Sequence, residues 1–175
     1  MGTVDADDVM ACIETAVARY EFCDSGRLGI MGGSYGGFMT SWLVGHTNMF
    51  KAALSERAVN NWISFFGSSD NGHVFKGEIG SWPFEDIDAY LKISPTTYAD
   101  AIETPLMIMH SEDDLRCNIE QAQYLFTHLR LRLKEVEMVR FPAESHELTR
   151  SGSPHHRIQR FDILLEWFDR YLQSG

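Results

Sequence analysis

Short apolar runs along the chain are separated by stretches with a wider apolar spacing. A continuous apolar run is typical of a buried strand, whereas apolar residues three or four positions apart are typical of a helix. The run "PLMIMH" at 105–110 is of the kind found in parallel strands that are buried on both faces. Strands are predicted at residues 27–31, 51–55, 105–110 and 136–141.

Helices are predicted between and around these strands. Asp5 is placed to cap the first helix, which extends to about Tyr20 and has Val9, Ile13 and Val17 on its apolar face. The last helix, at 155–172, has an apolar face made of Ile158, Phe161, Leu164, Leu165, Phe168 and Leu172. Further helices are expected at 38–44, 60–66, 85–93 and 119–131, and a long loop at 67–83.

The alternation of strands and helices predicts one α/β domain over residues 1–175. Its sheet is expected to be mainly parallel, with helices on both faces, because a parallel connection needs a crossover helix. The chain is long enough to bury a sizeable core. We find no internal repeat, low-complexity tract or long linker in the sequence.

Composition and charge narrow the classes of partner. Apolar residues make up 44% of the chain and charged residues 23%, which is ordinary for a globular protein. The net charge of −10 argues against nucleic acid or an anionic membrane as a partner, since both require a basic surface. No apolar stretch is long enough for a membrane span, and the acidic N-terminus does not resemble a signal peptide.

The three cysteines are sparse and lack metal-ligand spacing. Cys12, Cys23 and Cys117 are expected to be reduced thiols that act as small buried apolar residues. Reduced thiols indicate a cytoplasmic protein. No group of residues has the spacing of a metal site, so neither a metal nor another cofactor is expected.

One glycine-rich segment, "GGSYGG" at 32–37, contains a G-x-S-x-G motif around Ser34. The motif follows a predicted strand and precedes a predicted helix. In this setting a sharp turn presents the serine hydroxyl above the sheet, and the glycines on either side let strand and helix approach each other. The alternative is a flexible Gly-rich turn with no catalytic role.

Residues that would complete a catalytic triad follow in the order acid, then histidine. Glu112, Asp113 and Asp114 come directly after the strand at 105–110, and His146 follows the strand at 136–141. His146 would take the proton of Ser34 as general base, while the acid would orient its imidazole ring. The predicted chemistry is acyl transfer to water.

Three segments resemble the catalytic domain of the prolyl oligopeptidase family of serine peptidases, closest to its acylaminoacyl-peptidase-like branch. They are "RLGIMGGSYGGFMTSW", "HSEDDLRCNIEQAQYLF" and "RFPAESHELTRSG". The resemblance extends over nearly the whole chain. It implies an α/β-hydrolase fold and hydrolysis of short or N-acylated peptides without a cofactor.

Carried over by residue, the resemblance matches Ser34 to the nucleophile, Asp114 to the acid and His146 to the base. The H-G-x-x-D-x-R pattern of the family appears here with His110, Asp114 and Arg116 in place and with Ser111 where the family has glycine. The resemblance also implies that the backbone N–H of Tyr35 is an oxyanion donor. Substrate-binding residues are expected at Trp62, Phe66, Phe75 and Arg116.

Two of these assignments have alternatives. Arg116 would contact a substrate carbonyl, or it would form a surface ion pair with a nearby acid. Phe65, Phe66 and Phe75 would line the hydrophobic specificity pocket, or they would be ordinary core residues.

Compared with the family, the sequence contains only the C-terminal portion of the α/β-hydrolase fold. The N-terminal strands, the β-propeller and a His-Gly-Gly-Pro stretch that carries the second oxyanion donor are missing. We therefore expect an incomplete domain with a bare strand edge at 27–31, which invites a complementary N-terminal portion or self-association. The alternatives to a peptidase are a catalytically incomplete fragment and a carboxylesterase.

Overall fold

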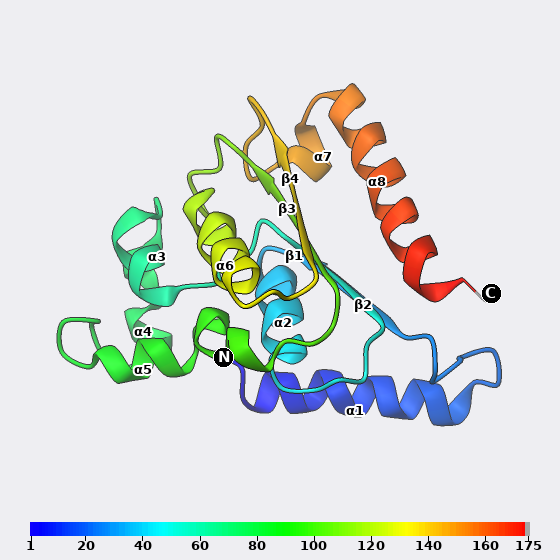
Figure 1. The fold of residues 1–175 in the computed structure, drawn as a ribbon. Coiled ribbons are helices and arrows are strands. Elements are labelled where there is room, and N and C mark those ends of the chain that lie inside the picture. Colours follow the sequence, from blue (N-terminus) through cyan, green and yellow to red (C-terminus); the bar gives the residue numbers. More distant parts are fainter. Residues whose placement is uncertain (174–175) are drawn as a thin grey trace.

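The fold is a parallel sheet covered by helices on both faces, as the sequence predicts (Figure 1). The computed structural model describes residues 1–173, and within them the sheet has four strands in the order β1-β2-β3-β4. Every neighbouring pair is parallel. The strands are β1 (Gly29–Gly33), β2 (Ala52–Glu56), β3 (Leu106–Ser111) and β4 (Val136–Phe141).

Helices α2 and α6 cover one face of the sheet and α8 covers the other (Figure 1). The α1 helix packs against the same core as α2 and α6. The main helices are α1 (Val4–Arg19), α2 (Tyr35–Val44), α6 (Glu120–Leu131) and α8 (Pro154–Leu172). Shorter ones are α3 (Trp62–Ser68), η1 (Gly72–Phe75), α4 (Lys76–Ile79), α5 (Ile87–Lys92), η2 (Pro95–Ala101) and α7 (Leu148–Ser151).

The two central strands are buried on both faces. All residues of β2 and β3 are buried, which confirms the sequence interpretation of "PLMIMH". Side chains from these strands alternate between two cores. Ala53, Leu106 and Ile108 belong to the core under α2 and α6, whereas Leu54 and Met107 belong to the core under α8.

The buried face of α8 differs from the predicted one. Among the six predicted apolar residues only Leu164 is buried, and Ile158, Phe161 and Leu165 are more than half exposed. The helix instead buries Arg160 and Trp167. The Trp167 indole N–H donates to the Ala53 carbonyl oxygen at 3.0 Å, and Arg160 binds a buried carboxylate. These polar contacts determine which face of the helix is buried, and the spacing of apolar residues does not predict them.

Three other local predictions are wrong. Asp5 is not the cap of α1, because Thr3 is at that position and the Asp5 carboxylate accepts hydrogen bonds from the N–H groups of Gly2 and Thr3. The predicted loop at 67–83 contains η1 and α4. Cys12 is exposed and Cys23 is half-buried, so only Cys117 has the expected buried position.

Strand β1 is an edge strand in the described part of the chain, where it pairs only with β2. Met31 at its centre is about half exposed. This confirms the predicted bare edge, while pairing of that edge with another chain stays a prediction. No helix within residues 1–173 is sufficiently long and apolar to span a bilayer.

A buried ion pair joins α8 to the end of β2. The Arg160 guanidinium contacts both carboxylate oxygens of Glu56, at 2.5 and 2.7 Å, and both side chains are at least nine-tenths buried. In such a pair the loss of one partner leaves an uncompensated buried charge. The pair therefore fixes the position of α8 relative to the strand end.

We predict that Arg160→Met lowers the free energy of unfolding by about 3–5 kcal/mol, because it strands the Glu56 charge in the interior. Adding Glu56→Gln should recover part of this loss. Urea unfolding monitored by tryptophan fluorescence measures both effects. As a control, Arg170→Met removes the exposed pair with Glu137 and should have little effect; equal losses for the two arginine variants would contradict the prediction.

Candidate active site

Ser34 lies at the turn between β1 and α2 in a conformation that few L-residues adopt. Its φ of 62° and ψ of −119° lie outside the usual allowed regions for residues with a side chain. The backbone N–H of Ser34 donates to the Glu56 carbonyl oxygen at 2.9 Å, which ties the turn to the end of β2. The strained turn is thus held by the neighbouring strand, and it is typical of functional sites.

Close approach of the backbone segments explains two of the glycines around Ser34. A Cβ on Gly32 would lie 2.4 Å from the Gly36 carbonyl group, and a Cβ on Gly37 would lie 2.5 Å from the Glu56 carbonyl oxygen. A Cβ on Gly36 would meet nothing within 4 Å. The expectation for the strand side of the motif is confirmed, but on the helix side the glycine without room for a side chain is Gly37.

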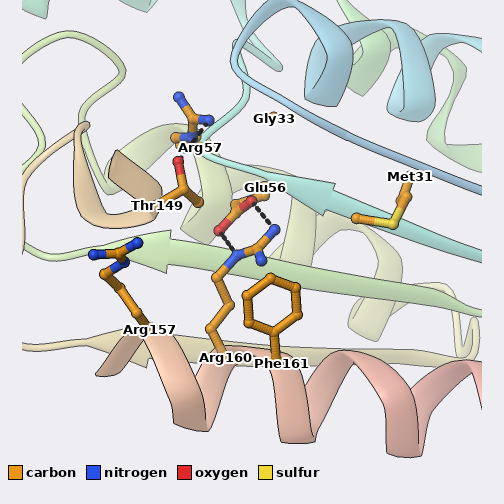
Figure 2. A pocket seen from close by; sticks show the side chains of 8 residues that line it. All are labelled: Met31, Gly33, Glu56, Arg57, Thr149, Arg157, Arg160 and Phe161. Atoms are coloured by element: carbon orange, nitrogen blue, oxygen red, sulfur yellow. Dashed lines mark hydrogen bonds and ion pairs between the residues drawn. The ribbon is translucent and has the colours of Figure 1, made fainter. Parts of the chain in front are cut away.

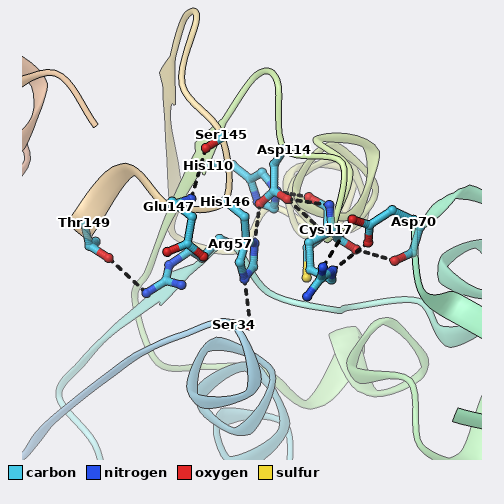
Figure 3. Close-up of polar contacts among 12 residues, drawn as sticks. Ser34, Arg57, Asp70, His110, Asp114, Cys117, Ser145, His146, Glu147 and Thr149 are labelled. Carbon is cyan, nitrogen blue, oxygen red and sulfur yellow. Dashed lines mark hydrogen bonds and ion pairs between the residues drawn. The ribbon is translucent and has the colours of Figure 1, made fainter. Parts of the chain in front are cut away.

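Ser34, His146 and Asp114 form a continuous hydrogen-bonded chain (Figure 3). The Ser34 Oγ lies 3.0 Å from His146 Nε2, and the His146 Nδ1 lies 2.7 Å from Asp114 Oδ2. An ionised carboxylate only accepts hydrogen bonds, so Nδ1 carries the proton and Nε2 accepts from the serine hydroxyl. The structure brings together the three residues that the sequence singles out, although they are up to 112 positions apart.

Asp114 is the acid that reaches the histidine. Its carboxylate is fully buried, and Oδ1 accepts hydrogen bonds from the backbone N–H groups of Arg116 (2.9 Å) and Cys117 (2.8 Å). Asp113 is exposed, and Glu112 forms an ion pair with Arg140. The loop after β3 thus turns one carboxylate of three towards His146, and backbone donors hold it in place.

His110 lies beneath this loop and is buried. Its Nε2 donates to the Cys117 carbonyl oxygen at 2.6 Å. Burial lowers the pKa of His110 from its ordinary value of 6.5, against the opposing effects of this hydrogen bond and of Asp114. A neutral His110 therefore fixes the loop that carries the acid.

Tyr35 is the first residue of α2, so its backbone N–H has no acceptor within the helix. This N–H adjoins Ser34 at the positive end of the helix dipole, where a developing negative charge is stabilised. The Tyr35 hydroxyl donates to the Asp5 carboxylate. Burial and this hydrogen bond raise the pKa of the Tyr35 hydroxyl.

A small cavity of about 140 Å³ opens next to Ser34. Three of the four predicted substrate-binding residues line it, namely Trp62, Phe75 and Arg116. Phe66 does not line it, because its ring packs against Trp82 and Phe84. The other residues that line the cavity are Ser34, Tyr35, Phe38, Val59, Phe65, Asn71 and Cys117.

Arg116 lines the cavity and also forms an ion pair. Its guanidinium contacts the two carboxylate oxygens of Asp70 at 2.6 and 3.2 Å, and both side chains are about half exposed. An exposed pair of this kind contributes little to stability.

Within residues 1–173, no three His, Cys, Asp or Glu side chains lie close enough together to hold a metal ion.

The chain as a whole is similar to known proteins. The family model described as the prolyl oligopeptidase family matches residues 1–175. The uncharacterized peptidase YuxL of Bacillus subtilis (strain 168) is 49% identical over 172 residues, which are 98% of this chain and 26% of that protein.

Solved structures agree with the sequence comparison. The acylaminoacyl peptidase of Pyrococcus horikoshii superimposes with a TM-score of 0.94 and 34% identity, over 99% of this chain and 29% of that chain. An acylaminoacyl peptidase in complex with Z-Gly-Gly-Phe-chloromethyl ketone superimposes equally well, at 33% identity and over the same shares of the two chains. The chain therefore has the fold of these enzymes and spans little more than a quarter of their length.

We predict opposite effects for alanine at two glycines of the Ser34 turn. Gly32→Ala should lower the free energy of unfolding by about 1–3 kcal/mol, because its Cβ collides with the Gly36 backbone. Gly36→Ala should raise it by up to about 1 kcal/mol, since alanine favours the helix and its Cβ has room. Chemical denaturation of the two variants tests this, and equal losses would contradict the geometry.

Because burial lowers the pKa of His110, the unfolded chain binds a proton there more readily than the folded chain. We therefore predict that the free energy of unfolding falls as the pH falls below about 6.5, the ordinary value for histidine. His110→Gln should flatten this decline. His128 also has a pKa lowered by burial, so the parallel variant His128→Gln measures its separate share. Identical pH profiles for wild type and His110→Gln would contradict the prediction.

Proposed function

The chain belongs to the prolyl oligopeptidase family, and we propose that it carries out the hydrolysis of peptides through Ser34, His146 and Asp114. The observation that carries the proposal is the hydrogen-bonded chain from Ser34 Oγ through the imidazole to the buried Asp114. A nucleophile, a base and an acid at these distances are the elements of acyl transfer.

In the proposed mechanism Ser34 Oγ attacks the scissile carbonyl carbon while His146 Nε2 takes the hydroxyl proton. Asp114 holds the imidazole in the tautomer that accepts this proton, and it stabilises the imidazolium that forms. The backbone N–H of Tyr35 donates to the oxygen that becomes negative. His146 then protonates the leaving amine. In the second half of the reaction a water molecule attacks the acyl carbonyl carbon while His146 takes its proton, and His146 then returns that proton to Ser34 Oγ.

We propose short or N-acylated peptides as the substrates. Two points support this class. The similar acylaminoacyl peptidase binds a Z-Gly-Gly-Phe chloromethyl ketone, and the cavity beside Ser34 has the Trp62 and Phe75 rings among its lining. An apolar acyl-side residue would fill this cavity, and Arg116 at its rim would donate to a substrate carbonyl.

A second candidate is that the chain works only together with a complementary chain. The exposed edge of β1 favours this, because the unpaired edge of a strand is a template for another strand. For either candidate we propose a location in a reducing compartment such as the cytoplasm, because the three cysteines are free thiols.

We predict that a fluorophosphonate probe labels the chain at one site and that Ser34→Ala abolishes labelling. His146→Ala should slow labelling by about 10²–10⁴-fold, because the general base is lost. Ser145→Ala is the matched control: this serine is exposed and next to His146 in sequence, and within residues 1–173 its hydroxyl bonds only to the N–H of Glu147. It should leave labelling unchanged. Mass spectrometry of the labelled peptide reads the site.

The outcomes separate the two candidates. Labelling that persists in Ser34→Ala would contradict the proposed nucleophile. A folded chain that is labelled only after a complementary N-terminal chain is added would support the second candidate. For a labelled chain, rates on acyl-peptides and on simple esters then distinguish a peptidase from an esterase.

A further inference from the structure

Arg57 occupies an unusual position directly after β2. It is buried, with 9% of its surface exposed, and its φ of 43° is positive, which is uncommon for a residue with a side chain. Its backbone N–H donates to the Met109 carbonyl oxygen at 2.9 Å. The backbone is thus held at the strand ends beside Ser34, whose N–H binds the preceding residue, Glu56.

The Arg57 side chain touches the segments of both proposed catalytic partners (Figure 3). Its Nη2 donates to the Thr149 Oγ1 at 3.2 Å, and Thr149 lies in α7, three residues after His146. Its guanidinium also covers Gly33, the residue before Ser34. A Cβ there would lie only 2.9–3.2 Å from three guanidinium atoms.

Arg57 forms no direct ion pair within the described residues, although its charge adds to the larger effect of the Arg150 hydrogen bond in lowering the pKa of the Glu147 carboxyl. Within residues 1–173 no carboxylate lies within ion-pair distance of Arg57, whereas the neighbouring Arg160 is paired with Glu56. The Nε and Nη1 atoms of Arg57 are buried and have no acceptor among the described residues. Such a desolvated cation is costly, so a role in the site accounts for it better than a role in stability.

We propose that Arg57 is a positioning residue that sets the distance between Ser34 and His146. One guanidinium both packs against Gly33 and holds Thr149, so it fixes the end of β1 relative to α7. The inference rests on the proposed function for the identity of the two partners. It assigns Arg57 no contact with the substrate.

A second set of contacts holds the His146 segment. The Glu144 carbonyl oxygen accepts the Asp113 N–H at 2.9 Å, and the buried Glu144 carboxylate binds the Ser153 N–H and the His156 ring. These contacts close residues 144–156 into a loop and tie it to the loop that carries Asp114, whereas Arg57 ties the same segment, at Thr149, to the end of β2 and to Gly33. Without the Arg57 contact the segment would shift relative to Ser34, and a misplacement of about 1 Å costs on the order of a hundredfold in rate.

A cavity of about 270 Å³ beside Arg57 makes the proposal testable (Figure 2). Gly33, Arg57 and Thr149 line it, together with the exposed Arg157. A small cation can therefore reach the space that the Arg57 side chain leaves when it is truncated. Arg157 lines the same cavity, and its side chain has no hydrogen bond or ion pair within the described residues. Replacing Arg157 therefore removes one positive charge, as replacing Arg57 does, but leaves the contacts with Gly33 and Thr149 in place.

The experiment uses the 175-residue chain with ¹⁵N-labelled histidine. In wild type, the His146 Nδ1–H bound to Asp114 should give a protected NMR signal, identified by its loss in His146→Gln. Arg57→Met and Thr149→Val should each broaden or remove this signal and slow fluorophosphonate labelling by about 10–100-fold. Guanidinium ion, well below unfolding concentrations, should restore both readouts in Arg57→Ala. Arg57→Lys should be intermediate.

Arg157→Met is the control and should leave both readouts unchanged. An Arg57→Met chain that keeps the wild-type signal and labelling rate would overturn the proposal, and so would equal effects of the two arginine variants, which would indicate charge alone. A wild-type chain that is never labelled would contradict the proposed function, but the NMR signal would still test the role of Arg57.

Discussion

The site depends on the strained turn at Ser34. A side chain at positive φ persists only where its surroundings hold it, and here the Glu56 carbonyl oxygen accepts the Ser34 N–H. The same carbonyl limits the space at Gly37, while Gly36 limits the space at Gly32. Strand β1, helix α2 and the end of β2 therefore meet at one point. That junction presents the serine hydroxyl to the histidine loop, which follows β4, the strand that β2 and β3 separate from β1 in the sheet.

Much of the fold could be predicted because its signals are local. Strands β2, β3 and β4 lie within one residue of their predicted positions. The signal is clearest for β3, because a strand buried on both faces favours a continuous apolar sequence. The buried face of α8 could not be predicted, because Arg160 and Trp167 are buried by long-range polar partners. The short helices at 72–79 were missed, since four-residue helices give too few turns for a periodic signal.

The proposed nucleophile, acid and base were predictable because each follows a strand in the chain order typical of this fold. Selection of Asp114 among three acids needed the family resemblance, and the structure shows the reason: backbone donors at 116 and 117 bind its Oδ1 and turn Oδ2 to His146. Nothing in the sequence indicates Arg57. Arg57 contacts Gly33 and Thr149, which lie 24 and 92 positions away in the sequence. A local sequence pattern cannot predict contacts over such separations.

We expect Ser34 to become acylated within this chain. Pre-steady-state release of p-nitrophenolate from p-nitrophenyl acetate measures that step directly, because the acyl-enzyme forms before it is hydrolysed. We expect a burst of one p-nitrophenolate per chain that disappears in Ser34→Ala. A linear release with no burst, at a rate that Ser34→Ala does not change, would contradict it.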